Sequence, residues 1–286
     1  CQISWLLAPR FSTRKAALTM WHTLLSLLLI TITQPLVAQL RFAYYDADRL
    51  YDTSESLFYN DTDYTPEGRY QWDSIRYNRK IEQTATRIDS LRADVVALYG
   101  VENEQVVRDI AMHLKGDYTY LHRTLNAFDG MDFALLYFAD RCEPLRAEAE
   151  RSMLTIEALM GRDTVLIILG ADPRFVRLKI KEVRATYPTR QFIVAGKIAS
   201  INPTAYGLTD RMAEPARRGH GTCVRNGQWQ MRDRIYTSPA CGTKEGAVVI
   251  QRAWLDGDSG TPCPTYEATR YRGGAGRHLP LWCEIE

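Results

Sequence analysis

The chain alternates between short apolar runs and amphipathic segments. Apolar and β-branched residues concentrate in five runs that predict strands, at residues 41–45, 94–99, 133–138, 164–169 and 191–196. Apolar positions recur at helical spacing among charged ones over 72–91, 104–114 and 174–186, which predicts helices packed by one face. Further strands are expected at 118–121, 235–237 and 247–250. This alternation is typical of a layered α/β domain in which helices cover a sheet.

The N-terminal segment differs from the rest. An apolar stretch that follows Met20 is too short to span a bilayer and predicts a secretory signal peptide that ends at Ala38. We interpret residues 1–38 as an upstream extension and signal peptide, with a buried N-terminal helix as the alternative. Residues 39–286 are then expected to form one domain of an exported protein, which is periplasmic, on the outer surface or secreted, with no transmembrane segment.

Charge and cysteine content narrow the function classes. The full chain has 36 basic and 34 acidic residues, and removal of residues 1–38 takes away three basic residues, leaving 33 against 34. A domain this close to neutral lacks the basic signature of most nucleic-acid-binding proteins. Export would permit disulfides, and we expect pairing among the four C-terminal cysteines, with Cys142 left free. Their spacing suggests neither a zinc site nor a redox motif. The four are Cys223, Cys241, Cys263 and Cys283.

The first candidate for chemistry is His278, which follows a glycine-rich stretch and has Arg277 as its neighbour. A catalytic histidine generally needs a carboxylate that fixes its tautomer and stabilises its charged form. An adjacent guanidinium lowers the pKa of a histidine instead. We therefore expect His278 to lack an acidic partner and to be structural rather than catalytic.

Several sequence blocks, in this order, resemble the endonuclease/exonuclease/phosphatase superfamily of deoxyribonuclease-I-like phosphoesterases, with the nearest likeness to a secreted branch common in Bacteroidetes. The resemblance covers nearly all of residues 40–284 and implies a four-layer α/β/β/α sandwich, two packed mixed sheets flanked by helices. The blocks are Ala43-Tyr44-Tyr45-Asp46-Ala47-Asp48-Arg49-Leu50-Tyr51-Asp52, Tyr64-Thr65-Pro66-Glu67-Gly68, Val101-Glu102-Asn103, Gly130-Met131-Asp132-Phe133-Ala134-Leu135-Leu136-Tyr137, Trp229-Gln230-Met231-Arg232-Asp233-Arg234-Ile235 and Arg277-His278-Leu279-Pro280.

The resemblance also implies a chemistry from which this chain departs. In the family, carboxylates hold a divalent metal, an Asp activates water, and Asn and His stabilise charge on the phosphate. This chain has Asp46 where the family has Asn, and Gly100 where it has the metal-binding Glu. The Asp-x-Asn pair is replaced by Lys197 and Ala199. We expect Lys197 to act as a fixed cation that pairs with Asp46 or Asp132.

These departures predict a catalytically degenerate member with a binding or structural role and no cofactor. The remnants of the catalytic set are Asp132, Asp233 and His278, and acids at strand ends also commonly anchor loops. A protein or a phosphate-containing ligand is the expected partner, with Lys197, Arg277 and Arg174 as its anion-binding side chains.

Two alternatives remain open. In the first, the chain is an active phosphodiesterase or nuclease that depends on Mg²⁺ or Mn²⁺, with Asp46 and Glu102 as metal ligands. In the second, it is a ligand-binding module unrelated to phosphate, with a cleft lined by aromatic side chains.

Overall fold

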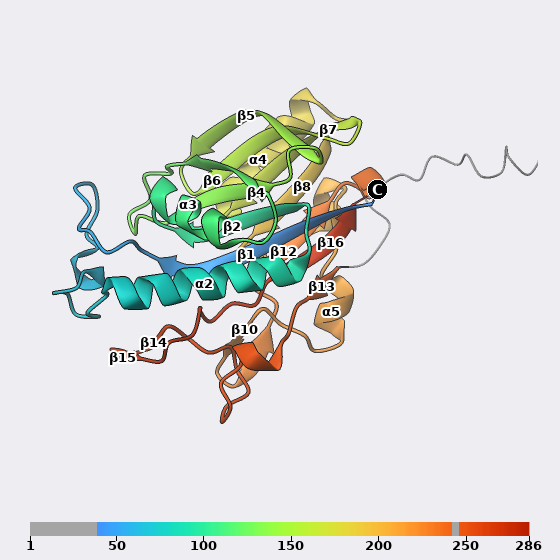
Figure 1. Cartoon of the computed structure of the whole chain (residues 1–286). Helices are drawn as coiled ribbons and strands as arrows, with labels where there is room; N and C mark the ends of the chain where they lie inside the picture. The colour runs from blue at the N-terminus through green and yellow to red at the C-terminus, as the bar shows by residue number, and fades with distance from the viewer. Residues whose placement is uncertain (1–38, 242–245, 286) are drawn as a thin grey trace, which may run out of the picture. The chain divides into compact units, whose positions relative to one another are not determined.

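Strands β1 (Leu40–Leu50) and β2 (Val95–Val101) are parallel neighbours joined through helix α2 (Ser74–Leu91) in the computed structural model, which describes residues 39–241 and 246–285 (Figure 1). Helix α2 begins where the Asp73 side chain accepts a hydrogen bond from the backbone N of Arg76 and ends at Arg92, which is left-handed. Its buried face, which includes Ile81 and Ile88, packs against the sheet.

The first sheet has six strands in the order β13-β16-β1-β2-β4-β3. Only β1 and β2 are parallel, and every other neighbouring pair is antiparallel. Helix α3 (Glu104–His113) packs beside α2. The remaining strands of this sheet are β3 (Thr119–Arg123), β4 (Asp132–Tyr137), β13 (Ala247–Val248) and β16 (Leu281–Ile285).

The second sheet has the order β5-β6-β7-β8-β12-β9, and its parallel pair β7/β8 is joined through helix α4 (Pro173–Thr186). Its strands are β5 (Cys142–Glu150), β6 (Met153–Met160), β7 (Asp163–Gly170), β8 (Gln191–Gly196), β9 (Thr209–Asp210) and β12 (Arg234–Thr237). The other described elements are α5 (Ala213–Arg217), the hairpins β10 (Cys223–Arg225)/β11 (Gln228–Gln230) and β14 (Tyr266–Glu267)/β15 (Arg270–Tyr271), and 3₁₀ turns at Thr62–Tyr64, Pro203–Tyr206, Pro239–Cys241 and Arg252–Trp254.

The apolar runs of the sequence lie in the middle of the sandwich because both faces of the central strands are covered. In β7, Ile167 belongs to the core shared by the two sheets, while Ile168 packs with Val176 and Ile180 of α4. The same period-two division separates Ile193 from Phe192 in β8. The layers are therefore helices, sheet, sheet and helix, which confirms the four-layer α/β/β/α sandwich predicted from the sequence.

The predicted signal segment at residues 1–38 lies outside the described residues.

The expected disulfide pairing among the four C-terminal cysteines is wrong for this structure, in which all five described cysteines are free. The three that approach a polar partner meet an oxygen rather than another sulfur. Cys241 Sγ lies 3.1 Å from Gln191 Oε1, and the Sγ atoms of Cys223 and Cys263 each lie 3.9 Å from a carbonyl oxygen, that of Gln230 and that of Pro264. No helix among the described residues is long and apolar enough to cross a membrane.

Candidate functional site

The strand directions bring the candidate residues to one edge of the two sheets. Asp46 lies on β1 near the end of its pairing with β2, and Lys197 directly follows β8. Antiparallel β12 pairs Arg234 with Gly196, so the preceding Asp233 reaches the same edge. Antiparallel β16 pairs Leu281 with Tyr44, which places His278 there as well. The site is therefore assembled from both sheets.

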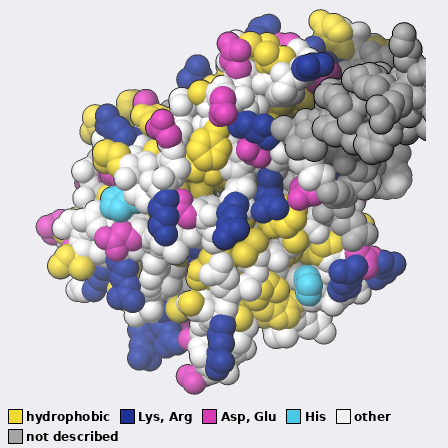
Figure 2. Space-filling view, turned by 45° about the vertical axis from the view of Figure 1, so that its right-hand side comes forward, with side chains coloured by type: hydrophobic (Ala, Val, Ile, Leu, Met, Phe, Trp, Pro, Cys, Tyr) yellow, Lys and Arg dark blue, Asp and Glu magenta, His cyan; other side chains and the backbone are white. Residues whose placement is uncertain are grey.

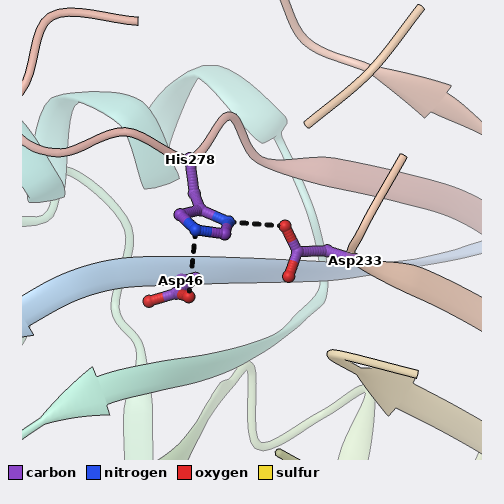
Figure 3. Close-up of side chains that lie close together, drawn as sticks. All are labelled: Asp46, Asp233 and His278. Carbon is purple, nitrogen blue, oxygen red and sulfur yellow. Dashed lines mark hydrogen bonds and ion pairs between the residues drawn. The ribbon is translucent and has the colours of Figure 1, made fainter. Parts of the chain in front are cut away.

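His278 lies between two buried carboxylates (Figure 3). Its Nδ1 is 2.6 Å from Asp233 Oδ2, and its Nε2 is 3.7 Å from Asp46 Oδ2. Burial alone lowers the pKa of His278, but the charges of Asp233 and Asp46 and the hydrogen bond to Asp233 raise it to about 9. The imidazole is therefore positively charged at neutral pH.

This geometry corrects the interpretation of His278. We expected it to lack an acidic partner and to have a pKa lowered by Arg277, and both expectations are wrong. The backbone N of Arg277 donates to Asp48 Oδ2 at 2.9 Å, and its side chain donates to the carbonyl of Tyr266 at 3.2 Å. The Arg277 side chain is 62% exposed, so its guanidinium lies in solvent beside Asp48 rather than against the imidazole.

Asp233 is fully enclosed, with 1% of its side chain exposed. Burial by itself would raise the pKa of its carboxyl, but the positive charge and hydrogen bond of His278 hold that pKa below its ordinary value. The backbone N of Asp233 donates to the hydroxyl of Thr222 at 3.3 Å, which fixes the start of β12. Asp233 Oδ1 is buried without a hydrogen-bond partner.

Lys197 is the second positively charged side chain beside Asp46, in addition to His278. Its Nζ is 2.8 Å from Asp46 Oδ2 and 4.6 Å from the centre of the Tyr99 ring. Burial alone lowers the pKa of Lys197, but the charge of Asp46 raises it above the ordinary value. The predicted pairing of Lys197 with Asp46 is confirmed. Tyr99, which supplies the ring beneath the ammonium group, was not identified from the sequence, although it directly precedes Gly100.

Gly100 occupies a bulge in β2, in its pairing with β4, and has a φ of +79°. A Cβ at this position would lie 2.9 Å from Asp46 Oδ1, an oxygen that also accepts a hydrogen bond from the backbone N of Asp48. A glutamate at position 100 would therefore require Asp46 to move. The two departures from the family pattern fit one another: the absence of a side chain at Gly100 makes room for the carboxylate of Asp46.

Glu102 and Asp132 do not join this cluster. Glu102 Oε1 accepts from the Tyr59 hydroxyl at 2.9 Å and its Oε2 from the backbone N of Asp52 at 2.5 Å. Burial raises the pKa of Glu102 to about 8. Asp132 Oδ1 accepts from the backbone N of Leu125 at 2.7 Å, and its Oδ2 is 2.9 Å from His122 Nε2.

The predicted anion-binding set already faces carboxylates. Lys197 contacts Asp46, Arg277 lies beside Asp48, and Arg174 pairs with Asp172, to which its Nη2 approaches within 2.6 Å. Arg174 is in the first turn of α4, and its side chain is exposed. An incoming anion would compete with an acid at each of the three positions.

A metal could approach only one group of described side chains with suitable spacing. Ligand atoms of Asp46, Asp233 and His278 all lie within 4.8 Å of one another. The unpartnered Asp233 Oδ1 is the kind of oxygen that a cation would use. Against this, the imidazole is protonated and the Lys197 ammonium occupies one side of Asp46. As they are paired, these residues do not fit a divalent cation.

Residues 41–177 match the model of the Endonuclease/Exonuclease/phosphatase family. The match confirms the family predicted from the sequence. It includes Asp46, Gly100 and Asp132, whereas Lys197, Asp233 and His278 lie beyond the matched residues. The family is usually dependent on a divalent metal, and Asp46, Asp233 and His278 form a possible carboxylate–histidine site among the described residues.

Solved structures share the fold at low sequence identity. An endonuclease/exonuclease/phosphatase family protein from Bacteroides thetaiotaomicron is 14% identical, with a TM-score of 0.54 over 87% of this chain and 95% of that one. The mannosyl-6-phosphatase of the same organism is 14% identical, with a TM-score of 0.54 over 86% and 99%. Humanized D. rerio TDP2 is 11% identical, with a TM-score of 0.56 over 87% and 99%. No curated protein matches the chain by sequence.

Proposed function

We propose that this chain is an exported, catalytically degenerate member of the endonuclease/exonuclease/phosphatase family with a binding or structural role. The observation that carries the proposal is the ammonium group of Lys197, 2.8 Å from Asp46 Oδ2. In the family, a divalent metal and an aspartate base occupy this edge of the sheets. Here a lysine occupies the position of the base and supplies the positive charge.

Charge balance supports the proposal. At neutral pH, Lys197 and His278 are positive while Asp46 and Asp233 are negative, so the cluster is neutral without a metal. A divalent cation would meet the repulsion of an ammonium group already bound to one of its ligands. Lys197 also cannot accept a proton from water, because its pKa is raised. Loss of one preorganised charge stabiliser typically costs ~10²–10³ in rate, and here both the base and the metal glutamate are replaced.

Titration with Mn²⁺ and Mg²⁺, followed by calorimetry, tests the proposal. We expect no saturable binding by the unmodified chain. Lys197→Asp should create a Mn²⁺ site, because it removes the ammonium and adds a carboxylate. Lys181→Asp makes the same charge change on the exposed side of α4 and should not. Tight binding by the unmodified chain that is lost in Asp46→Ala would overturn the proposal.

The nature of the partner is also a proposal. Each predicted anion-binding side chain has an acidic neighbour, and on the face in Figure 2 basic side chains are interspersed with acidic and apolar ones. These observations favour a protein partner over a nucleic acid. Gel-shift measurements with DNA and RNA should show no binding, and binding that weakens steeply with salt would contradict this preference.

A second function is favoured by one observation, the hydrogen bond of 2.6 Å between buried Asp233 and His278. This pairing is the arrangement through which an acid orients a catalytic histidine. An active phosphodiesterase or nuclease would use it with a rearranged set of neighbours. Turnover of DNA, RNA and phosphate esters should then fall strongly in His278→Ala. Equal rates for this variant and the unmodified chain would eliminate the second function.

A further inference from the structure

A cavity of about 610 Å³ lies beside the end of β2, between the loop that follows β1 and the loop that precedes β4. Its volume is within the range of small-molecule sites. The lining includes none of the four residues of the ion-paired cluster, which are Asp46, Lys197, Asp233 and His278. The walls come from residues 52, 54–59, 102–103, 124, 126–127, 130 and 132.

The charge of this cavity has one sign. Its lining contains Asp52, Glu55, Glu102 and Asp132 but no lysine, arginine or histidine. Among the described residues, Asp132 alone of these acids has a basic partner, which is His122.

The other lining acids are held by neutral donors. Asp52 accepts from the backbone N of Ser54 at 2.6 Å and from Asn103 Nδ2 at 2.8 Å. Glu55 accepts from the hydroxyl of Thr62 at 2.9 Å. These hydrogen bonds position the carboxylates but leave their negative charge without a counter-ion, so the wall attracts a cation.

Apolar side chains stand at the mouth of the same cavity. Leu57 and Phe58 line it and are 95% and 91% exposed. The Tyr59 ring is beside them in the sequence and also lines the cavity. Large apolar side chains left in water next to a cavity provide surface that a ligand with a hydrocarbon body would cover.

We propose that this cavity binds a small organic amine. Its ammonium group pairs with the carboxylates of Asp52 and Glu55, and its hydrocarbon body covers Leu57 and Phe58. This binding is separate from any chemistry at the Asp46–His278 cluster. The negatively charged wall favours the ammonium group of such a ligand, and the exposed apolar side chains at the mouth favour its hydrocarbon part.

Calorimetric titration of the full chain with 2-phenylethylamine tests the site, with 2-phenylethanol and 3-phenylpropionate as neutral and anionic probes of similar shape. The amine should bind, the alcohol should bind roughly tenfold more weakly or worse, and the carboxylate should not bind. Equal affinity for amine and alcohol, or no binding of the amine, would overturn the proposal.

Variants locate the binding on the chain. Glu55→Gln, at an exposed position, should weaken the amine by roughly tenfold and leave the alcohol unchanged. Phe58→Ser should weaken amine and alcohol alike. Glu67→Gln removes an exposed acid outside the lining and serves as the matched control. An amine affinity that Glu55→Gln leaves unchanged, or that Glu67→Gln reduces equally, would place the binding elsewhere and refute the site.

Discussion

At the scale of single residues, the contact between Lys197 and Asp46 is the most consequential, because each partner is buried enough to depend on the other. Lys197→Met removes the nearest positive charge of the Asp46 carboxylate, which is 1% exposed, and leaves only His278 Nε2 at 3.7 Å. We expect the free energy of unfolding to fall by about 2 kcal/mol, less than for a fully buried pair because the Lys197 side chain is 34% exposed. Urea unfolding measures the loss.

The control for that prediction is a double-mutant cycle. Asp46→Asn in the Lys197→Met background should recover most of the stability, since it removes a buried charge that has lost its nearest partner. Lys181→Met, on the exposed surface of α4, should change stability by no more than about 0.5 kcal/mol. Additive effects of the two substitutions would show that the pair is not coupled.

His278 makes a prediction about pH. Its pKa is about 9 in the folded chain and about 6.5 in an unfolded one, so the protonated imidazole stabilises the fold fully below pH 6.5. That contribution, about 3 kcal/mol at most, is lost as the pH rises through 9. Unfolding of the unmodified chain and of His278→Gln at several pH values measures it. A His278→Gln variant whose stability changes with pH as much as that of the unmodified chain would contradict the assignment.

The sequence predicted the pairing of Lys197 with Asp46 correctly but did not identify the partner of His278. Lys197 and Asp46 follow from replaced positions in a known pattern, and their pairing is as expected. The interpretation of His278 relied on its neighbour Arg277, but the Arg277 side chain contacts Asp48 and the carbonyl of Tyr266 instead of the imidazole. The true partner, Asp233, is 45 residues away, and only the strand arrangement brings the two together.

At the scale of elements, the bulge at Gly100 sets the position of Asp46. Gly100→Ala should destabilise the fold by about 2–3 kcal/mol, because it strains a positive φ and brings a Cβ within 2.9 Å of Asp46 Oδ1. Gly161 has a φ of +65° with nothing within 4 Å, so Gly161→Ala reports the backbone strain alone, about 1 kcal/mol. Thermal or urea unfolding compares them, and equal losses would remove Asp46 from the explanation.

Strands and helices were predictable where burial is uniform. Strands β7 and β8 are apolar on both faces and were predicted within a residue or two. Strands β5 and β6 were missed, because Glu, Ala, Leu and Met favour helices and β5 is an edge strand with one buried residue, Cys142. Helix α2 was expected to start at Trp72, but its first turn begins only after the Asp73 cap.

At the scale of the whole molecule, the site exists only because two sheets meet at one edge. The family resemblance implied this arrangement, whereas local periodicity gives no information on which strands are neighbours. The family resemblance assigns Glu102 and His278 to the same catalytic region. The fold separates them, since Glu102 is held by Tyr59 and Asp52 and none of the three contributes to the cluster.

Glu102 in the cavity and His278 in the cluster both contribute to the pH dependence of the free energy of unfolding. The pKa of Glu102 is about 8 in the fold against about 4.5 unfolded, and Asp52, Tyr59 and Asp61 are the titratable groups that face it. Its ionisation opposes folding, so stability falls between pH 4.5 and 8, and His278 extends the fall to about pH 9. Glu102→Gln should leave stability near pH 4.5 unchanged and raise it by about 2 kcal/mol near pH 8.5. Urea unfolding across this range measures the difference, and a variant less stable than the unmodified chain at pH 8.5 would show that the Glu102 carboxylate stabilises the loop.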